Sequence, residues 1–156
     1  MRDTVLAGVI DMTGDVEQIL IDAAERIGGA TSCSVILRME QGLRRVASSD
    51  PRAAACDDAE VADRGGPCVL AMDQLAGVIV PDVSLETRWP GWVAAADAGG
   101  FRSGAALPAY VRDGVVLALN LYSEQLDPWD AEALVRADGY AQEIAEALRE
   151  PGGGPR

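Results

Sequence analysis

The sequence contains no histidine, which removes the commonest general base and the commonest protein ligand for metals. Its absence also removes the partner that activates a serine or cysteine nucleophile in many hydrolases, and the usual axial ligand of haem. Lysine is absent as well, so all 13 basic residues are arginines. We therefore expect no enzyme, no metal site and no cofactor.

Cysteine is scarce and widely spaced, at Cys33, Cys56 and Cys68. An odd number without a CxxC pair predicts neither a disulfide framework nor a zinc site. The first residues do not resemble a signal peptide, and no stretch reaches the roughly 18 apolar residues of a membrane span. These absences favour a protein of the reducing cytoplasm.

Acidic residues outnumber basic ones, 25 to 13, which gives a formal net charge of −12. A negative surface repels phosphate backbones and anionic lipids, so we expect neither a nucleic acid nor a membrane as partner. The length of 156 residues fits one domain. We expect this domain at residues 1–150 and a flexible glycine- and proline-rich tail at residues 151–156.

Hydrophobic periodicity and turn residues predict helices and strands that do not alternate strictly, which indicates a largely antiparallel sheet. Residues 115–119 form a continuous apolar run, typical of a central strand buried on both faces. The predicted elements are a helix at 14–29, strands at 33–39 and 44–48, short helices at 57–64 and 67–72, a strand at 78–80, a helix at 93–98, strands at 102–110 and 115–123, and a last helix ending near 148.

The last helix carries a clear start signal, with Asp127 as the expected N-cap and Pro128 as the expected first helical residue. Its apolar residues repeat every three or four positions from Leu134 to Leu148. This apolar face would either cover the sheet or, together with the first helix, form a homodimer interface.

Several short motifs occur in an order that resembles the GAF domains of actinobacterial GAF–ANTAR regulators. The resemblance covers residues 14–148 and rests on Gly66-Pro67-Cys68, Val80-Pro81-Asp82, Arg88-Trp89-Pro90, Ala94-Ala95-Ala96, Gly100-Phe101-Arg102-Ser103, Leu107-Pro108 and Ala118-Leu119-Asn120-Leu121-Tyr122.

The resemblance implies an α/β (α+β) fold, with a central antiparallel sheet of about five to six strands flanked by N- and C-terminal helices. It also implies a sensory or regulatory role and dimerisation through the terminal helices. The usual output of this subgroup is an RNA-binding ANTAR domain, for which the chain leaves no room. We therefore expect the signal to pass to a protein partner or to another domain of a longer protein.

A small-molecule pocket is one interpretation of the aromatic residues in the second half of the chain. Arg102 is the arginine expected beside them, and it would bind an anion or a carboxylate. The alternative is that the tryptophans cover the core and Arg102 makes a surface ion pair. The candidate ligand-binding residues are Asp82, Trp89, Trp92, Phe101, Arg102, Asn120 and Tyr122.

Cys56 and Cys68 are redox candidates, because Cys68 stands near an expected helix start, where the helix dipole lowers a thiol pKa. Their positions resemble those of cysteines in free methionine-R-sulfoxide reductases, which are GAF-type enzymes. Those enzymes need a third cysteine farther along, and none follows Asp82. The alternative is that both thiols are small core residues.

Three functions remain open at this point: a sensor of a small molecule, an interaction domain with a collapsed pocket, and a thiol-based reductase. The absence of histidine disfavours haem, and also bilin attachment through a cysteine followed by histidine. The sequence therefore predicts a class of protein without naming a ligand.

Overall fold

A computed structural model describes residues 13–149. Five strands and five α-helices, with one short 3-10 helix, follow each other along this part of the chain. The elements are α2 (Thr13–Ile27), β1 (Thr31–Met39), β2 (Gly42–Ser48), α3 (Pro51–Asp63), α4 (Pro67–Gln74), β3 (Val78–Val80), η1 (Val83–Leu85), α5 (Pro90–Ala98), β4 (Ser103–Arg112), β5 (Val115–Ser123) and α6 (Ala131–Arg149).

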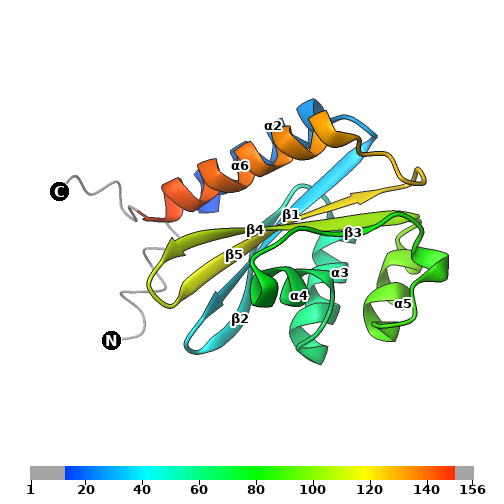
Figure 1. Cartoon of the computed structure of the whole chain (residues 1–156), viewed down its shortest axis with the longest axis horizontal. Coiled ribbons are helices and arrows are strands. Elements are labelled where there is room, and N and C mark those ends of the chain that lie inside the picture. The colour runs from blue at the N-terminus through cyan, green and yellow to red at the C-terminus, as the bar shows by residue number, and fades with distance from the viewer. Residues whose placement is uncertain (1–12, 150–156) are drawn as a thin grey trace.

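The strands form one antiparallel sheet in the order β2-β1-β5-β4-β3 (Figure 1). The predicted α+β class with a central antiparallel sheet is therefore confirmed. β5 lies in the middle, paired with β1 on one side and β4 on the other. Its nine residues are nearly all buried, because helices cover both faces of the sheet.

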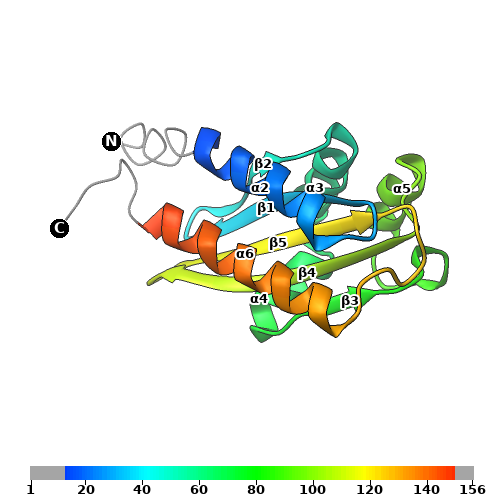
Figure 2. The same ribbon diagram turned by 90° about the horizontal axis from the view of Figure 1, so that it is seen from above.

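Helices α2 and α6 lie side by side over one face of the sheet, and α3, α4 and α5 cover the other (Figures 1 and 2). Successive residues of a strand point to opposite faces, so β5 contributes to both layers. Leu117, Leu119 and Leu121 belong to the large apolar core beneath α2 and α6. Asn120 and Tyr122 point to the other layer, where two smaller apolar clusters flank polar side chains.

Helix α3 is longer than predicted, because it begins at Pro51 rather than near residue 57. Asp50 is its N-cap, and the Asp50 carboxylate accepts a hydrogen bond from the backbone N–H of Arg52 at 2.8 Å. Proline at the first helical position has no N–H to leave unpaired, so the Asp50-Pro51 pair starts the helix. This start was overlooked because the segment is rich in alanine and has no large apolar residues.

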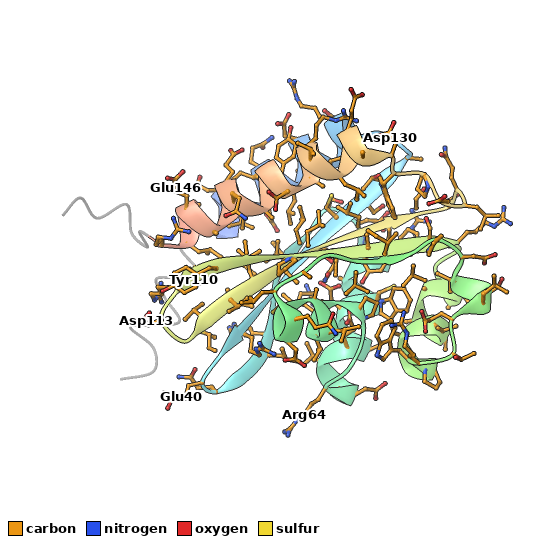
Figure 3. The ribbon with its side chains drawn as sticks, viewed as in Figure 1. Glu40, Arg64, Tyr110, Asp113, Asp130 and Glu146 are labelled. Atoms are coloured by element: carbon orange, nitrogen blue, oxygen red, sulfur yellow. The ribbon has the colours of Figure 1, made fainter. Side chains whose placement is uncertain are left out.

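The predicted start of the last helix is wrong. Asp127 has φ 44°, a left-handed conformation, and α6 begins at Ala131. Trp129 between them is buried, and its Nε1–H donates to Thr31 Oγ1 at 2.8 Å. Asp130 is the N-cap, since its carboxylate accepts from the backbone N–H of Ala133 at 2.8 Å; Figure 3 shows Asp130 at the beginning of this helix.

The other predicted helices and strands are present, with ends displaced by a few residues. The expected tail at residues 151–156 lies outside the described residues. Within residues 13–149, no helix is both long enough and apolar enough to cross a membrane.

Replacement of the N-cap of α6 tests the corrected helix start. Asp130→Ala should lower the free energy of unfolding by about 1 kcal/mol, because the N–H of Ala133 loses its acceptor. Asp127→Gly, the matched control, should change it by no more than a few tenths of a kcal/mol, because glycine tolerates a positive φ. Urea unfolding followed by circular dichroism measures both; a larger loss for Asp127→Gly would contradict the assignment.

Candidate functional site

Two carboxyl groups on α3 are buried against the sheet. Asp57 and Glu60 are three residues apart, which places them on one face of the helix, and their exposed fractions are 0% and 1%. Acidic side chains are almost never buried to this extent unless they are paired or serve a function. Glu60 and Asp57 therefore mark the first candidate site of the molecule.

The Asp57 carboxyl is fixed by hydrogen bonds from the central strand. Its Oδ1 accepts from Asn120 Nδ2 at 3.1 Å and from the hydroxyl of Tyr122 at 3.0 Å. The Tyr122 oxygen in turn accepts from Trp92 Nε1–H at 3.3 Å. The chain of bonds thus joins α3, β5 and α5 through one carboxyl oxygen.

The Glu60 carboxyl holds the beginning of α4. Its Oε2 accepts from the backbone N–H of Cys68 at 2.9 Å, so a side chain of α3 takes the place of an N-cap for α4. Gly66 makes this approach possible, because a Cβ at this position would lie 2.0 Å from Glu60 Oε2. The Gly66-Pro67-Cys68 motif therefore has a physical basis: glycine admits the carboxyl, and proline starts the helix.

Four buried side-chain oxygens have no hydrogen-bond partner within the described residues. Such groups are rare, and each costs about 1–3 kcal/mol when it is left unpaired. Ser34, on β1, is close enough to Asp57 to lower its pKa, although its hydroxyl makes no hydrogen bond of normal geometry. The four atoms are Ser34 Oγ, Asp57 Oδ2, Glu60 Oε1 and Asn120 Oδ1, and together with their hydrogen-bonding neighbours they form what we call the polar cluster.

Burial raises the pKa of both carboxyl groups. The pKa of Asp57 rises from 3.8 to about 7 because burial disfavours the charged form, against the opposing effects of the neighbouring Ser34 hydroxyl and of the hydrogen bonds from Tyr122 and Asn120. The pKa of Glu60 rises from 4.5 to about 8, chiefly through burial and then through the neighbouring Asp57. Both groups thus titrate near neutral pH, which is typical of functional sites.

Aromatic side chains cover one side of the polar cluster. Phe101 stacks on Tyr122 with ring centroids 5.1 Å apart, and Trp92 lies 6.1 Å from Tyr122. Trp89 meets Trp92 edge to face at 6.3 Å. Among the predicted ligand-binding residues, these four aromatics and Asn120 are brought together.

The structure does not bring Asp82 and Arg102 together with this group. The Asp82 carboxylate accepts from the backbone N–H and the hydroxyl of Ser84, so it caps η1. Arg102 is exposed. The arginines beside the aromatics are instead Arg52, 4.6 Å over the Phe101 ring, and Arg88, 4.2 Å over the Trp89 ring.

All three cysteines are buried and free. Burial raises the pKa of Cys33 and of Cys56 to about 12, and that of Cys68 well above its usual 9.0. The Glu60 and Asp57 carboxyls add to the effect of burial at Cys68, so the prediction that the start of α4 lowers the pKa of this thiol is wrong. Neither redox candidate has the environment of a reactive thiolate.

Two hollows on the surface of residues 13–149 are lined by none of the residues of the polar cluster. One, of about 480 Å³, is lined by residues that include Arg38, Leu43 and Arg64, at the β1–β2 hairpin and the end of α3. The other, of about 640 Å³, lies between α2 and α6. Within the described residues, no group of three or more cysteine, aspartate or glutamate side chains is arranged to hold a metal ion.

Sequence reasoning missed Ser34, Asp57 and Glu60. A signal was present, since Ala53, Cys56, Asp57 and Glu60 recur at the spacing of one helical face. Because that face contains small and polar residues, its periodicity in hydrophobicity is weak, and the segment resembles a solvent-exposed one.

A family model described as GAF domain matches residues 14–149, so the chain belongs to the GAF domain family, whose members are typically sensory or regulatory. The agreement extends over nearly all the described residues and includes the polar cluster. No curated protein matches the sequence.

Solved structures of similar fold come from several kinds of protein. The GAF domain region of a protein from Geobacter sulfurreducens PCA is 16% identical with a TM-score of 0.71, over 94% of this chain and 98% of that chain. A type II free methionine-R-sulfoxide reductase from Thermoplasma acidophilum is 12% identical with a TM-score of 0.66, over 91% and 96%. The GAF domain of an Acinetobacter phosphoenolpyruvate-protein phosphotransferase is 13% identical with a TM-score of 0.64, over 100% and 97%. At these identities the likeness concerns the fold alone.

The raised carboxyl pKa values predict a pH-dependent stability. The folded protein keeps protons that the unfolded chain loses above about pH 4, so the contribution of Asp57 is complete below that pH and is lost as the pH rises through about 7. In Asp57→Asn, thermal unfolding should therefore depend less on pH between about 4 and 8 than in the parent protein. Asp58→Asn, an exposed neighbour on α3, should keep the parental dependence; equal slopes in all three proteins would contradict the prediction.

The burial of the thiols predicts low reactivity. At about pH 8, iodoacetamide should modify Cys56 and Cys68 at least ~100-fold more slowly in the folded protein than in urea, because little thiolate is present and access is closed. Mass spectrometry of tryptic peptides measures each site separately. Rapid modification of Cys68 in the folded protein would restore it as a redox candidate.

Proposed function

We propose that this GAF domain is a sensor that binds a small molecule at the polar cluster and transmits the signal through its helices to a partner. The observation that carries the proposal is the group of four unpaired side-chain oxygens sealed between α3, α4 and the sheet. A domain without a ligand gains nothing from such groups, because apolar residues of similar shape would remove their cost.

The proposal keeps Trp92, Phe101, Asn120 and Tyr122 as residues of the binding site and adds Ser34, Asp57 and Glu60. Trp89 is retained as a neighbouring residue that covers Trp92. The site is sealed, so ligand entry requires α3, α4 or α5 to move relative to the sheet. A change of this kind is what a sensor needs, since binding is then coupled to the arrangement of the helices.

A second candidate function is that of an interaction domain without a ligand, in which α2 and α6 form a homodimer. Val135 on α6 is 72% exposed and Ile21 on α2 is 46% exposed, so each helix presents a large apolar side chain to solvent. Dimerisation through this face is also compatible with the sensor, since a dimer would carry the signal to the output partner.

The remaining parts of the proposal follow from composition and from the site. The three free cysteines support a cytoplasmic regulator. The excess of acidic residues supports a protein output without direct contact with nucleic acid or membrane. We also propose a relationship to GAF–ANTAR regulators, because the short motifs from Gly66-Pro67-Cys68 onward occur in the order typical of that subgroup. A thiol reductase is not proposed, because Cys56 and Cys68 are buried with raised pKa values.

Native mass spectrometry of the protein as purified from cells tests the proposal. We expect a non-covalent small mass on the parent protein and on Asp58→Asn, and its loss from Asp57→Asn, because Asp57 is central to the polar cluster. A mass retained equally by Asp57→Asn would place the site elsewhere. A dimer without any retained mass would favour the interaction domain.

A further inference from the structure

The two buried carboxyl groups have the same arrangement of bonded and unbonded oxygens. Asp57 uses Oδ1 for its bonds from Asn120 and Tyr122, and Oδ2 is unpaired. Glu60 uses Oε2 for the N–H of Cys68, and Oε1 is unpaired. Each carboxyl is thus held by one oxygen, while the other has no hydrogen-bond partner among the described residues.

The two remaining unpaired atoms come from the sheet and are also oxygens. Asn120 Oδ1 can only accept a hydrogen bond, and Ser34 Oγ can accept or donate. Both side chains are at least 99% buried, since their exposed fractions are 1% and 0%. Three buried acceptors from two layers therefore have no hydrogen-bond donor of normal geometry among the described residues.

Among residues 13–149, no positive side chain balances these groups inside the polar cluster. The ionisable groups that affect the two carboxyls from the packed elements are Cys56 on α3, Cys68 on α4 and Tyr122 on β5, all with raised pKa values. Arg45 on β2 acts on Asp57 at longer range, but it is exposed and paired with Asp58 at 2.9 Å. An anionic ligand would thus lack a cationic partner here.

We propose that the polar cluster binds a small organic cation with several N–H donors, such as an ammonium or guanidinium group, and that each positive charge bound displaces one carboxyl proton. This inference rests on the proposed sensor function and names the chemical class of its ligand. The N–H donors would pair with Asp57 Oδ2, Glu60 Oε1 and Asn120 Oδ1.

The proton balance follows from the burial of the carboxyls. Without a ligand both are largely protonated below about pH 7, because burial disfavours their ionised forms. A bound cation favours the ionised form, so a proton leaves to the buffer. A neutral ligand with acceptor groups would do the opposite, since it would need the protonated carboxyl as donor and would take up protons above that pH.

Binding would also act on α4. Glu60 Oε2 holds the first turn of this helix, and Gly66 leaves no room for the carboxyl to retreat on that side. A cation at Oε1 would ionise the carboxyl and would thereby strengthen the bond that Oε2 accepts from the backbone N–H of Cys68. Helix α4 is therefore the element through which ligand binding at the polar cluster would change the surface of the domain.

Isothermal titration calorimetry tests the ligand class on the whole chain. The probes are methylammonium, guanidinium at millimolar concentration and agmatine, with acetamide and acetate as neutral and anionic controls of small size. At about pH 6, in two buffers of different ionisation enthalpy, we expect the cations to bind with release of about one proton for each positive charge. Asp57→Asn and Glu60→Gln should each weaken binding by roughly tenfold or more, and Asp58→Asn should not.

Each other outcome would overturn the inference. Binding of acetamide or acetate in preference to the cations, or proton uptake on binding, would mean that the polar cluster is a site for a different class of ligand. Native mass spectrometry could also find a retained ligand that Asp57→Asn loses, while no cation binds in calorimetry. That result, too, would mean that the polar cluster binds a different class of ligand. No binding and no retained ligand would overturn the sensor function together with the ligand class.

Discussion

The Asp57 carboxyl is the group on which one whole face of the sheet depends. Its Oδ1 receives bonds from Asn120 and Tyr122 on the central strand, and Tyr122 receives one from Trp92 on α5. A fully buried acid in an otherwise apolar layer is destabilising unless its bonds or its protonation offset the burial. The packing of α3 and α5 on the sheet therefore includes a titratable group that responds to pH and to any ligand that replaces the proton.

The two faces of the sheet serve different purposes because β5 is buried on both. The face beneath α2 and α6 supplies the large apolar core. The opposite face carries Ser34, Asn120 and Tyr122 at alternate positions of β1 and β5, among smaller apolar clusters. The large core on the first face supplies most of the stability. The second face can therefore hold buried polar groups, which lower the stability but can bind the ligand of a sensor.

Helix α4 is connected to the site by a single atom. Glu60 Oε2 binds the first turn of α4, and the absence of a side chain at Gly66 allows that contact. The same two carboxyls raise the pKa of Cys68, so the thiol that resembles a redox centre in the sequence is a buried core group in the fold. The polar cluster thus accounts for the glycine–proline–cysteine motif without any thiol chemistry.

The sequence by itself determined the α+β class, the β4–β5 hairpin and the central position of β5, because these depend on local periodicity and turn residues. Its signals were weaker at helix starts, where Asp127-Pro128 imitates the cap that Asp130 provides. Only the tertiary structure decided the site. Asp57, Ser34 and Asn120 are far apart in the chain, and a carboxylate on a short alanine-rich helix gives no sign of being buried. The Asp57 carboxyl becomes part of a site only because strand β5 packs against it. No local sequence pattern specifies which distant segments pack together.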